Sequence, residues 1–122
     1  MRNPDNLLVL ARANALLLSL HQSPLRAKGA RAPGLSAQLL RATSSIPFNI
    51  AEGAGLDDRG FVRHLTIAIA SANEAEQQLR LAHALALLGE HGSWYLTEIV
   101  EIRRMMIGLK KAVIKKLESQ PG

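Results

Sequence analysis

Hydrophobic residues recur at helical spacing along four segments of the chain, at about residues 5–23, 35–53, 58–88 and 94–118. The third segment has the most regular pattern, in which apolar positions alternate steps of four and three. Its members are Phe61, Leu65, Ala68, Ala72, Ala75, Leu79, Ala82 and Ala86. Because short connections join the four segments, the pattern predicts an all-α fold, an antiparallel up-down four-helix bundle that forms one domain over residues 1–122.

Residues that favour helix ends mark the expected boundaries. Pro4 or Asp5 should begin the first helix, since proline is tolerated in a first turn and aspartate accepts hydrogen bonds from free backbone N–H groups. Asp57 or Asp58 should cap the third helix for the same reason, and Ser93 should cap the fourth. Each cap supports the boundary that the hydrophobic pattern indicates.

The connection between the first two helices, residues 23–34, predicts an exposed loop. It contains two prolines and two glycines, which are typical of turns. It also carries three cations, Arg26, Lys28 and Arg31. These cations either contact phosphate or simply keep the loop solvated.

The first helix is hydrophobic over more than one face. One apolar stripe includes Leu10 and Leu17, and a second consists of Leu8, Ala11, Ala15 and Leu18. A bundle helix needs only about three apolar positions in seven. The excess indicates either a contact between subunits or a loosely packed monomer. The apolar run is too short to span a bilayer and is interrupted by Arg12, so no membrane association is expected.

The segment Arg41–Gly53 organises the rest of the chain because it carries a proline inside a helical pattern. Pro47 lacks an N–H group and clashes with the carbonyl of Thr43, so the helix either kinks or divides in two there. Side chains that could bond the freed backbone groups lie close by: Ser44, Ser45 and Asn49. Gly53 and Gly55 are expected to adopt positive φ and end the helix.

This segment also resembles a known family. Ser45-Ile46-Pro47 followed by Asn49-Ile50-Ala51-Glu52-Gly53 resembles the signature of the intervening-sequence proteins, small four-helix bundles often encoded inside inserts in bacterial large-subunit ribosomal RNA genes. A second block follows the family pattern Ser-x-x-Glu-Leu-Glu-x-x-Leu, with Ala75 in place of the central leucine. The architecture is also similar to the accessory protein of diversity-generating retroelements.

The resemblance implies a structural motif of recurring polar and glycine positions. These are Ser45, Pro47, Asn49, Glu52, Gly53, Ser71, Glu74 and Glu76. We interpret the polar members as a network between helices around Pro47, and the alternative is a ligand or subunit contact. Glu76 lies beside the apolar lane and would need a partner if buried, such as Arg41, Arg80, Arg12 or Ser44. The resemblance also implies a homo-oligomer, a closed ring of five subunits.

Composition excludes several kinds of chemistry. The chain has no cysteine, which excludes disulfides, thiol catalysis and cysteine-ligated zinc and agrees with a cytoplasmic location. No Glu-x-x-His pair occurs, and the four histidines are scattered over the chain, so we expect no metal site. The sequence shows no nucleophile paired with a base and no cofactor fingerprint. We therefore expect no enzyme activity and no cofactor.

Basic residues concentrate at the end of the last helix. They are Arg103, Arg104, Lys110, Lys111, Lys115 and Lys116. Cations are favoured near a helix C-terminus and also solvate exposed faces, but the net charge of +5 favours a polyanionic partner. The leading hypothesis is a non-catalytic oligomeric scaffold that binds RNA or structured nucleic acid by its phosphates, without aromatic stacking platforms. The alternative is a scaffold for a protein partner, for example a reverse transcriptase.

Overall fold

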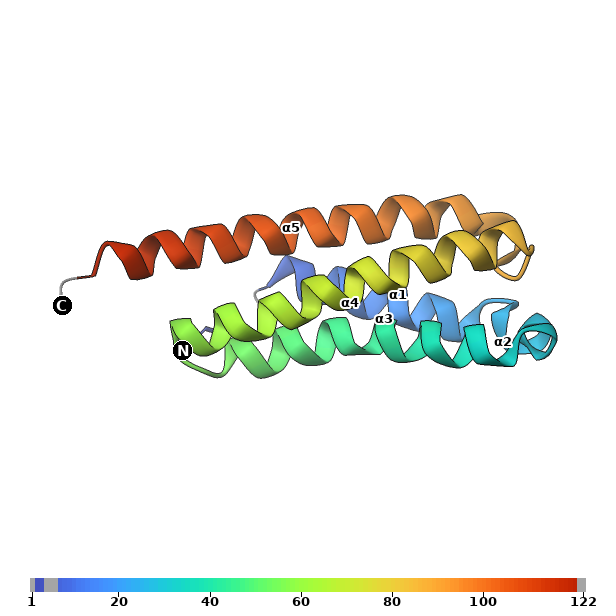
Figure 1. Cartoon of the computed structure of the whole chain (residues 1–122), viewed down its shortest axis with the longest axis horizontal. Helices are drawn as coiled ribbons and strands as arrows, with labels where there is room; N and C mark the ends of the chain where they lie inside the picture. The colour runs from blue at the N-terminus through green and yellow to red at the C-terminus, as the bar shows by residue number, and fades with distance from the viewer. Residues whose placement is uncertain (1, 4–6, 121–122) are drawn as a thin grey trace.

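The computed structural model describes residues 2–3 and 7–120, and these form an all-α bundle without a strand. Four long helices account for most of the chain: α1 (Leu8–Gln22), α3 (Pro33–Ala54), α4 (Asp58–Ala84) and α5 (Gly92–Glu118). Figure 1 shows them side by side along one axis, with the C-terminal end of α5 extending past the other helices. The predicted start of the first helix at Pro4 or Asp5 lies outside the described residues. No helix in the described part of the chain is long and apolar enough to cross a membrane.

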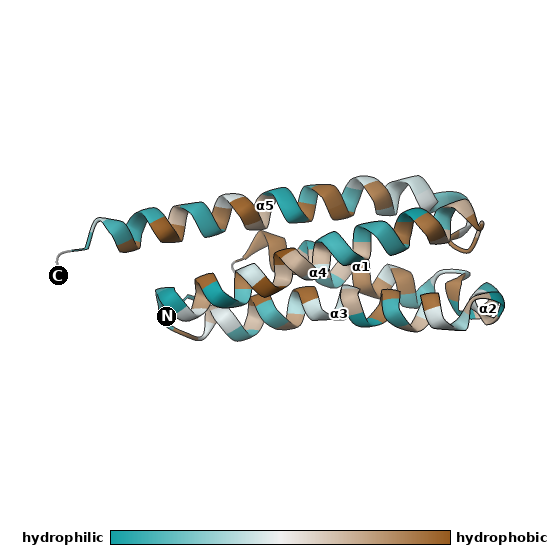
Figure 2. Ribbon diagram, viewed as in Figure 1, coloured by the Kyte–Doolittle hydropathy of each residue, from teal (hydrophilic) through white to brown (hydrophobic). Residues whose placement is uncertain are grey.

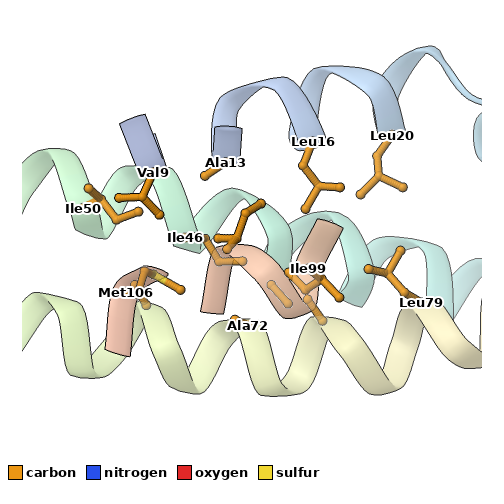
Figure 3. Packing of buried hydrophobic residues seen from close by; sticks show 14 of the residues in the cluster. Val9, Ala13, Leu16, Leu20, Ile46, Ile50, Ala72, Leu79, Ile99 and Met106 are labelled. Carbon is orange, nitrogen blue, oxygen red and sulfur yellow. The ribbon is translucent and has the colours of Figure 1, made fainter. Parts of the chain in front are cut away.

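The core lies along the common axis of the bundle and draws on all four long helices. Leu16 of α1, Ile46 of α3, Leu79 of α4 and Ile99 of α5 are fully buried and point toward one another (Figure 3). Burying a side chain of this size stabilises the fold by about 1.5–3 kcal/mol. The hydrophobic pattern of the third predicted helix is confirmed, since its members from Phe61 to Ala82 are all buried.

The helix α4 ends four residues earlier than the pattern predicts. The chain leaves the helix through Ala86, whose φ is 59°. The N–H of Leu87 donates to the carbonyl of Ala82 at 2.9 Å, and the N–H of Ala86 donates to that of His83 at 3.0 Å. These two bonds are those of a Schellman motif, in which glycine usually takes the left-handed position. The turn carries Leu87 and Leu88 into the core, which explains why the helix stops.

The expectation that residues 23–34 form an exposed loop is wrong. The segment contains the short helix α2 (Leu25–Lys28) and the 3-10 turn η2 (Gly29–Arg31). Leu25 is buried in the core, and Gly29 packs so closely that a Cβ atom there would lie 2.3 Å from Ser36 Oγ. The three cations of the segment are exposed, as expected.

Pro47 lies within a single helix, because α3 runs from Pro33 to Ala54 without a break. Side chains near the proline bond backbone carbonyls, as predicted, but not the one that Pro47 leaves free at Thr43. Ser44 Oγ donates to the Leu40 carbonyl at 2.7 Å, and Asn49 Nδ2 donates to the Ser45 carbonyl at 2.8 Å.

The predicted role of the two glycines at the end of this helix is wrong. Gly55 has φ −81°, and Gly53 is a buried residue inside α3. Gly53 is required for packing instead, since a Cβ atom there would lie 2.7 Å from His64 Cβ and 3.4 Å from Phe61 Cα. The glycine allows α3 and α4 to approach each other closely at this end of the bundle.

The helix caps follow the sequence in one case of two. Asp57 precedes α4, and its Oδ1 accepts from the Gly60 N–H at 2.8 Å, as predicted. Ser93 does not cap α5, which begins one residue earlier at Gly92. A Cβ atom on Gly92 would lie 2.1 Å from His83 Nδ1, so a larger residue there would require the exposed His83 ring to move.

Candidate nucleic-acid surface and polar clusters

The six cations predicted on α5 divide into those held by the bundle and those that face outward. Arg103 lies against α4 and bonds the carboxylate of Glu76, with 23% of its side chain exposed. Lys116 Nζ lies 3.3 Å from Asp58 Oδ2 at the start of α4. Both cations therefore serve as links between helices.

The remaining cations line the outer side of α5. Arg104, Lys111 and Lys115 are exposed at steps of seven and four, so they share one face of the helix. Arg104 pairs only with Glu101 of the same helix, at 3.2 Å. A pair this exposed contributes little to stability. Lys110 is half-buried at the side of this stripe, and like Lys111 and Lys115 it makes no ion pair with another described residue.

Figure 2 shows hydrophilic and hydrophobic stretches alternating along α5, as expected of a helix with one buried and one solvated face. The stripe of Arg104, Lys111 and Lys115 also includes Gly108, where a Cβ atom would meet no other atom within 4 Å. This part of α5 is thus positive, with Gly108 at its centre and the exposed Ile107 beside it. We call Arg104, Gly108, Lys111 and Lys115 the α5 stripe.

Glu76 is the buried charge of the bundle. Its carboxylate accepts from Arg80 Nη2 at 2.7 Å, one helical turn away, and from Arg103 across the α4–α5 contact. Hydrogen bonds from Arg80 and Arg103 lower the pKa of Glu76 against the opposing effect of burial. Of its expected partners, Arg80 is confirmed. The remaining candidates do not bond it, and Arg103, expected to face nucleic acid, takes that place.

A second polar cluster joins α3 to α4 beside Pro47. Ser71 Oγ donates to Ser45 Oγ at 2.8 Å, and Asn49 Nδ2 donates to the same oxygen at 3.0 Å. Asn49 Oδ1 lies 2.9 Å from His64 Nδ1. The cluster thus contains Ser45, Asn49 and Ser71 of the motif that the sequence predicts. His64 was not predicted as a member of this cluster, although its position seven residues before Ser71 places both on one lane of α4.

The other motif residues lie outside this cluster. Glu52 is exposed, and Glu74 is an exposed residue that accepts from Gln78 Nε2 at 3.2 Å. Pro47 and Gly53 are buried and have no polar side chain. The motif therefore combines one polar cluster, one separate ion-pair centre at Glu76 and two packing positions.

A polar cleft of about 350 Å³ opens between α3 and α4 above the serines. Its lining consists of Gln38, Arg41, Ala42, Ser45, Ser71 and Glu74. Arg41 makes no ion pair with another described residue, so a cation on α3 faces the same cleft as a carboxylate on α4. The cleft lies on a different side of α4 from Glu76, whose ion pairs join α4 to α5.

Two further ion pairs join separate parts of the bundle, one between α1 and α5 and one between the N-terminal segment and α4. Arg12 of α1 donates through Nε and Nη2 to Glu98 of α5, at 2.7 and 3.0 Å. Arg2 bonds Asp58 and lies 4.2 Å from the ring centre of Phe61, a cation–π contact. The hydrogen bond from Arg2, followed by that from Lys116, lowers the pKa of Asp58. These charges serve the fold.

No group of three histidine, aspartate or glutamate side chains lies close enough to hold a metal ion within the described ranges. The fold and the clusters define a small all-α bundle in which paired polar residues join the long helices and a basic stripe faces outward. The sequence also matches a known protein family. The family model for the 23S rRNA-intervening sequence protein matches residues 5–108, and the chain belongs to this family.

The fold is also similar to that of a solved structure. A crystal structure from Bacteroides thetaiotaomicron, described as a protein with unknown function from the S23 ribosomal protein family, superposes with a TM-score of 0.58. The two sequences are 24% identical, and the match covers 82% of this chain and 98% of that chain. At this identity the likeness supports the fold alone. No curated protein matches the sequence.

Proposed function

We propose that the protein is a non-catalytic, oligomeric scaffold that binds RNA or structured nucleic acid through the α5 stripe. One observation carries the proposal: carboxylates of the bundle hold Arg103 and Lys116, whereas Lys111 and Lys115 face solvent without an ion pair to a described residue. Exposed cations without a carboxylate partner are available to bind phosphate.

The dimensions of the α5 stripe suit a phosphate backbone. Arg104 and Lys115 are eleven residues apart on one helix, which corresponds to about 16 Å at a rise of 1.5 Å per residue. Phosphates follow one another about every 3.4 Å of axis along one strand of a duplex, so the stripe can reach several of them. The net charge of +5 favours the approach of any polyanion.

Assembly would multiply this surface. The second apolar stripe of α1 stays uncovered in the monomer, with Leu8 65% and Leu18 58% exposed. An apolar stripe of this kind is favoured at a subunit contact. In a closed ring, such as the ring of five that the family resemblance implies, several α5 stripes would act on one nucleic acid and raise the avidity.

The test begins with light-scattering mass on nucleic-acid-free protein. Titration with a labelled RNA hairpin and a DNA duplex at two salt concentrations then measures affinity. The triple variant K110Q/K111Q/K115Q should bind more weakly and lose part of the salt dependence. If each lysine contacts one phosphate, the slope of log K against log salt on the duplex should fall by about 2.7.

The segment 23–34 provides a matched control. Arg26, Lys28 and Arg31 are exposed and make no ion pair with a described residue, so R26Q/K28Q/R31Q removes the same charge from a different surface. If both triple variants weaken binding equally, net charge alone drives it and α5 is not the site. If neither does, the proposed surface is wrong.

The alternative function is a scaffold for a protein partner, with a reverse transcriptase as the example that the resemblance to the retroelement accessory protein provides. The exposed apolar stripe of α1 favours it, because such a stripe also suits a foreign helix. An oligomer that binds neither the RNA hairpin nor the DNA duplex at low salt would support this alternative. A stable monomer would instead remove the subunit role of α1.

A further inference from the structure

Phe48 is an exposed aromatic residue on the outer face of α3. Its side chain is 67% exposed, whereas its neighbours Ile46 and Ile50 are fully buried. No aromatic stacking platform is expected from the sequence, but the exposed ring of Phe48 offers a surface of that kind. A phenylalanine that contributes this little to the core is available to stack on a nucleic-acid base, which is how single-stranded RNA is commonly held.

Phe48 lies beside the polar cleft between α3 and α4. It follows Ser45 by three residues and Arg41 by seven, so the three side chains emerge from neighbouring turns of one helix face. Ser45 and Arg41 both line the cleft. Phe48 is outside the cleft lining itself, but an aromatic ring, a cation and a hydroxyl thus lie along one lane of α3.

The hydrogen bonds of Ser45 leave one proton without an acceptor. Its Oγ accepts from Ser71 Oγ at 2.8 Å and from Asn49 Nδ2 at 3.0 Å, which occupies both lone pairs. With Ser71 as the donor, no hydrogen bond from Ser45 Oγ to a described residue is present, so this hydroxyl is available to donate to a ligand. The α3 wall of the cleft therefore presents two available hydrogen-bond donors, the Ser45 hydroxyl and the guanidinium of Arg41.

The α4 wall of the cleft presents hydrogen-bond acceptors instead. Glu74 is a carboxylate without a cationic partner among the described residues, and its one hydrogen bond comes from Gln78 Nε2. Gln78 Oε1, on the same side chain, is buried without a donor within the described ranges. A ligand that satisfies both walls must carry an anionic acceptor on one side and a hydrogen-bond donor on the other.

We propose that this cleft and Phe48 form a binding site for one ribonucleotide unit of single-stranded RNA. The base stacks on Phe48, the phosphate accepts from Arg41 and Ser45, and the ribose 2′-hydroxyl donates to Glu74. DNA lacks this hydroxyl, so the site distinguishes RNA from DNA. The inference rests on the proposed function because it names the form of nucleic acid bound, but it uses residues on α3 and α4 instead of α5.

The experiment measures fluorescence anisotropy of a labelled single-stranded RNA of about eight nucleotides and of the DNA of the same sequence. The wild-type protein should prefer RNA by about tenfold, the value of one hydrogen bond to a charged group. F48L keeps the apolar area and loses the aromatic face, and should weaken RNA and DNA alike by about tenfold. E74Q should reduce the preference for RNA.

Two variants serve as matched controls. Arg63 is an exposed arginine on α4 without an ion pair to a described residue, so R63Q removes the same charge as R41Q. Leu81 is an exposed apolar residue of α4, so L81A removes apolar surface elsewhere on the bundle without removing an aromatic ring. Binding of single-stranded RNA should be weaker in R41Q than in R63Q, and weaker in F48L than in L81A.

The outcomes separate this inference from the proposed function. F48L and R41Q could bind RNA as strongly as their controls L81A and R63Q, while K110Q/K111Q/K115Q binds more weakly than R26Q/K28Q/R31Q. This result would overturn the nucleotide site in the cleft and support the α5 stripe. If the wild-type protein binds no polynucleotide at low salt, the proposed function fails, and NMR titration with a ribonucleoside 5′-monophosphate decides the cleft. Shifts at the Ser45 and Ser71 amides that the deoxyribonucleotide does not produce would support it, and their absence would overturn it.

A change in light-scattering mass in F48L would place Phe48 in a subunit contact and overturn the site.

Discussion

The ion pair between Arg103 and Glu76 is the contact whose removal should most affect the stability of the bundle. R103L leaves the side chain nearly isosteric in its stem but takes one of two cations away from a buried carboxylate. Glu76 cannot move to solvent, because only 10% of its side chain is exposed. The variant therefore leaves a buried charge with half of its partners.

The expected loss is about 2 kcal/mol. Leaving a buried charge without a partner costs about 3–5 kcal/mol, but Arg80 remains bonded to Glu76 and Arg103 itself is partly solvated. The double variant E76L/R103L should recover most of the loss, because it removes the charge as well as its partner. A cost of this size lowers the melting temperature of a domain of this length by several degrees.

The assay is urea denaturation of the wild-type protein and both variants, repeated as the pH is lowered. The folded-state pKa of Glu76 is depressed, so its contribution to stability is present above the unfolded pKa and is lost as the pH falls through the folded value. Wild type and R103L should therefore converge at low pH, where the carboxylate is protonated in both. Equal stability of R103L and wild type at neutral pH would refute this role of the ion pair, as would a double variant less stable than R103L.

Two further substitutions test the backbone. A86G should stabilise the protein by about 0.5–1 kcal/mol in thermal melts, because glycine adopts the left-handed φ of 59° without steric cost; an unchanged or lower melting temperature would argue against a Schellman motif there. G53A should destabilise by about 1–3 kcal/mol, since its Cβ would lie 2.7 Å from His64 Cβ. In the control G34A the added Cβ meets no atom within 4 Å, and the variant should be stabilised by up to about 1 kcal/mol because alanine favours a helix. Equal stability of the two would contradict close packing of α3 on α4.

The fold could be predicted from the sequence because its signal is periodic. The regular steps from Phe61 to Ala82 fix the buried face of α4, and burial follows the pattern there without exception. The end of the same helix could not be predicted, because the turn at Ala86 depends on the burial of Leu87 and Leu88 by other helices. The burial of Leu25 could not be predicted either, because a single leucine among prolines and glycines forms no periodic pattern.

The candidate site was predictable only where partners lie on one helix. Arg80 stands four residues from Glu76, which a helical pattern reveals, whereas Arg103 comes from another helix and depends on how α5 is rotated against α4. Its charge looked the same in sequence as that of Lys111. Phe48 shows the converse, because a residue two positions from both Ile46 and Ile50 lies on the opposite side of a helix, so its exposure could be predicted from the sequence.

The rotation of α5 connects the buried charge to the proposed surface. Arg103 can reach Glu76 only if its side of the helix faces α4, and this orientation turns Arg104, Lys111 and Lys115 toward solvent. The buried face of α5, which includes Ile102 and Met106, sets this orientation, and the ion pair between Arg103 and Glu76 adds to it. A variant such as R103L would act on nucleic-acid binding through that orientation, since the guanidinium itself is already engaged inside the bundle.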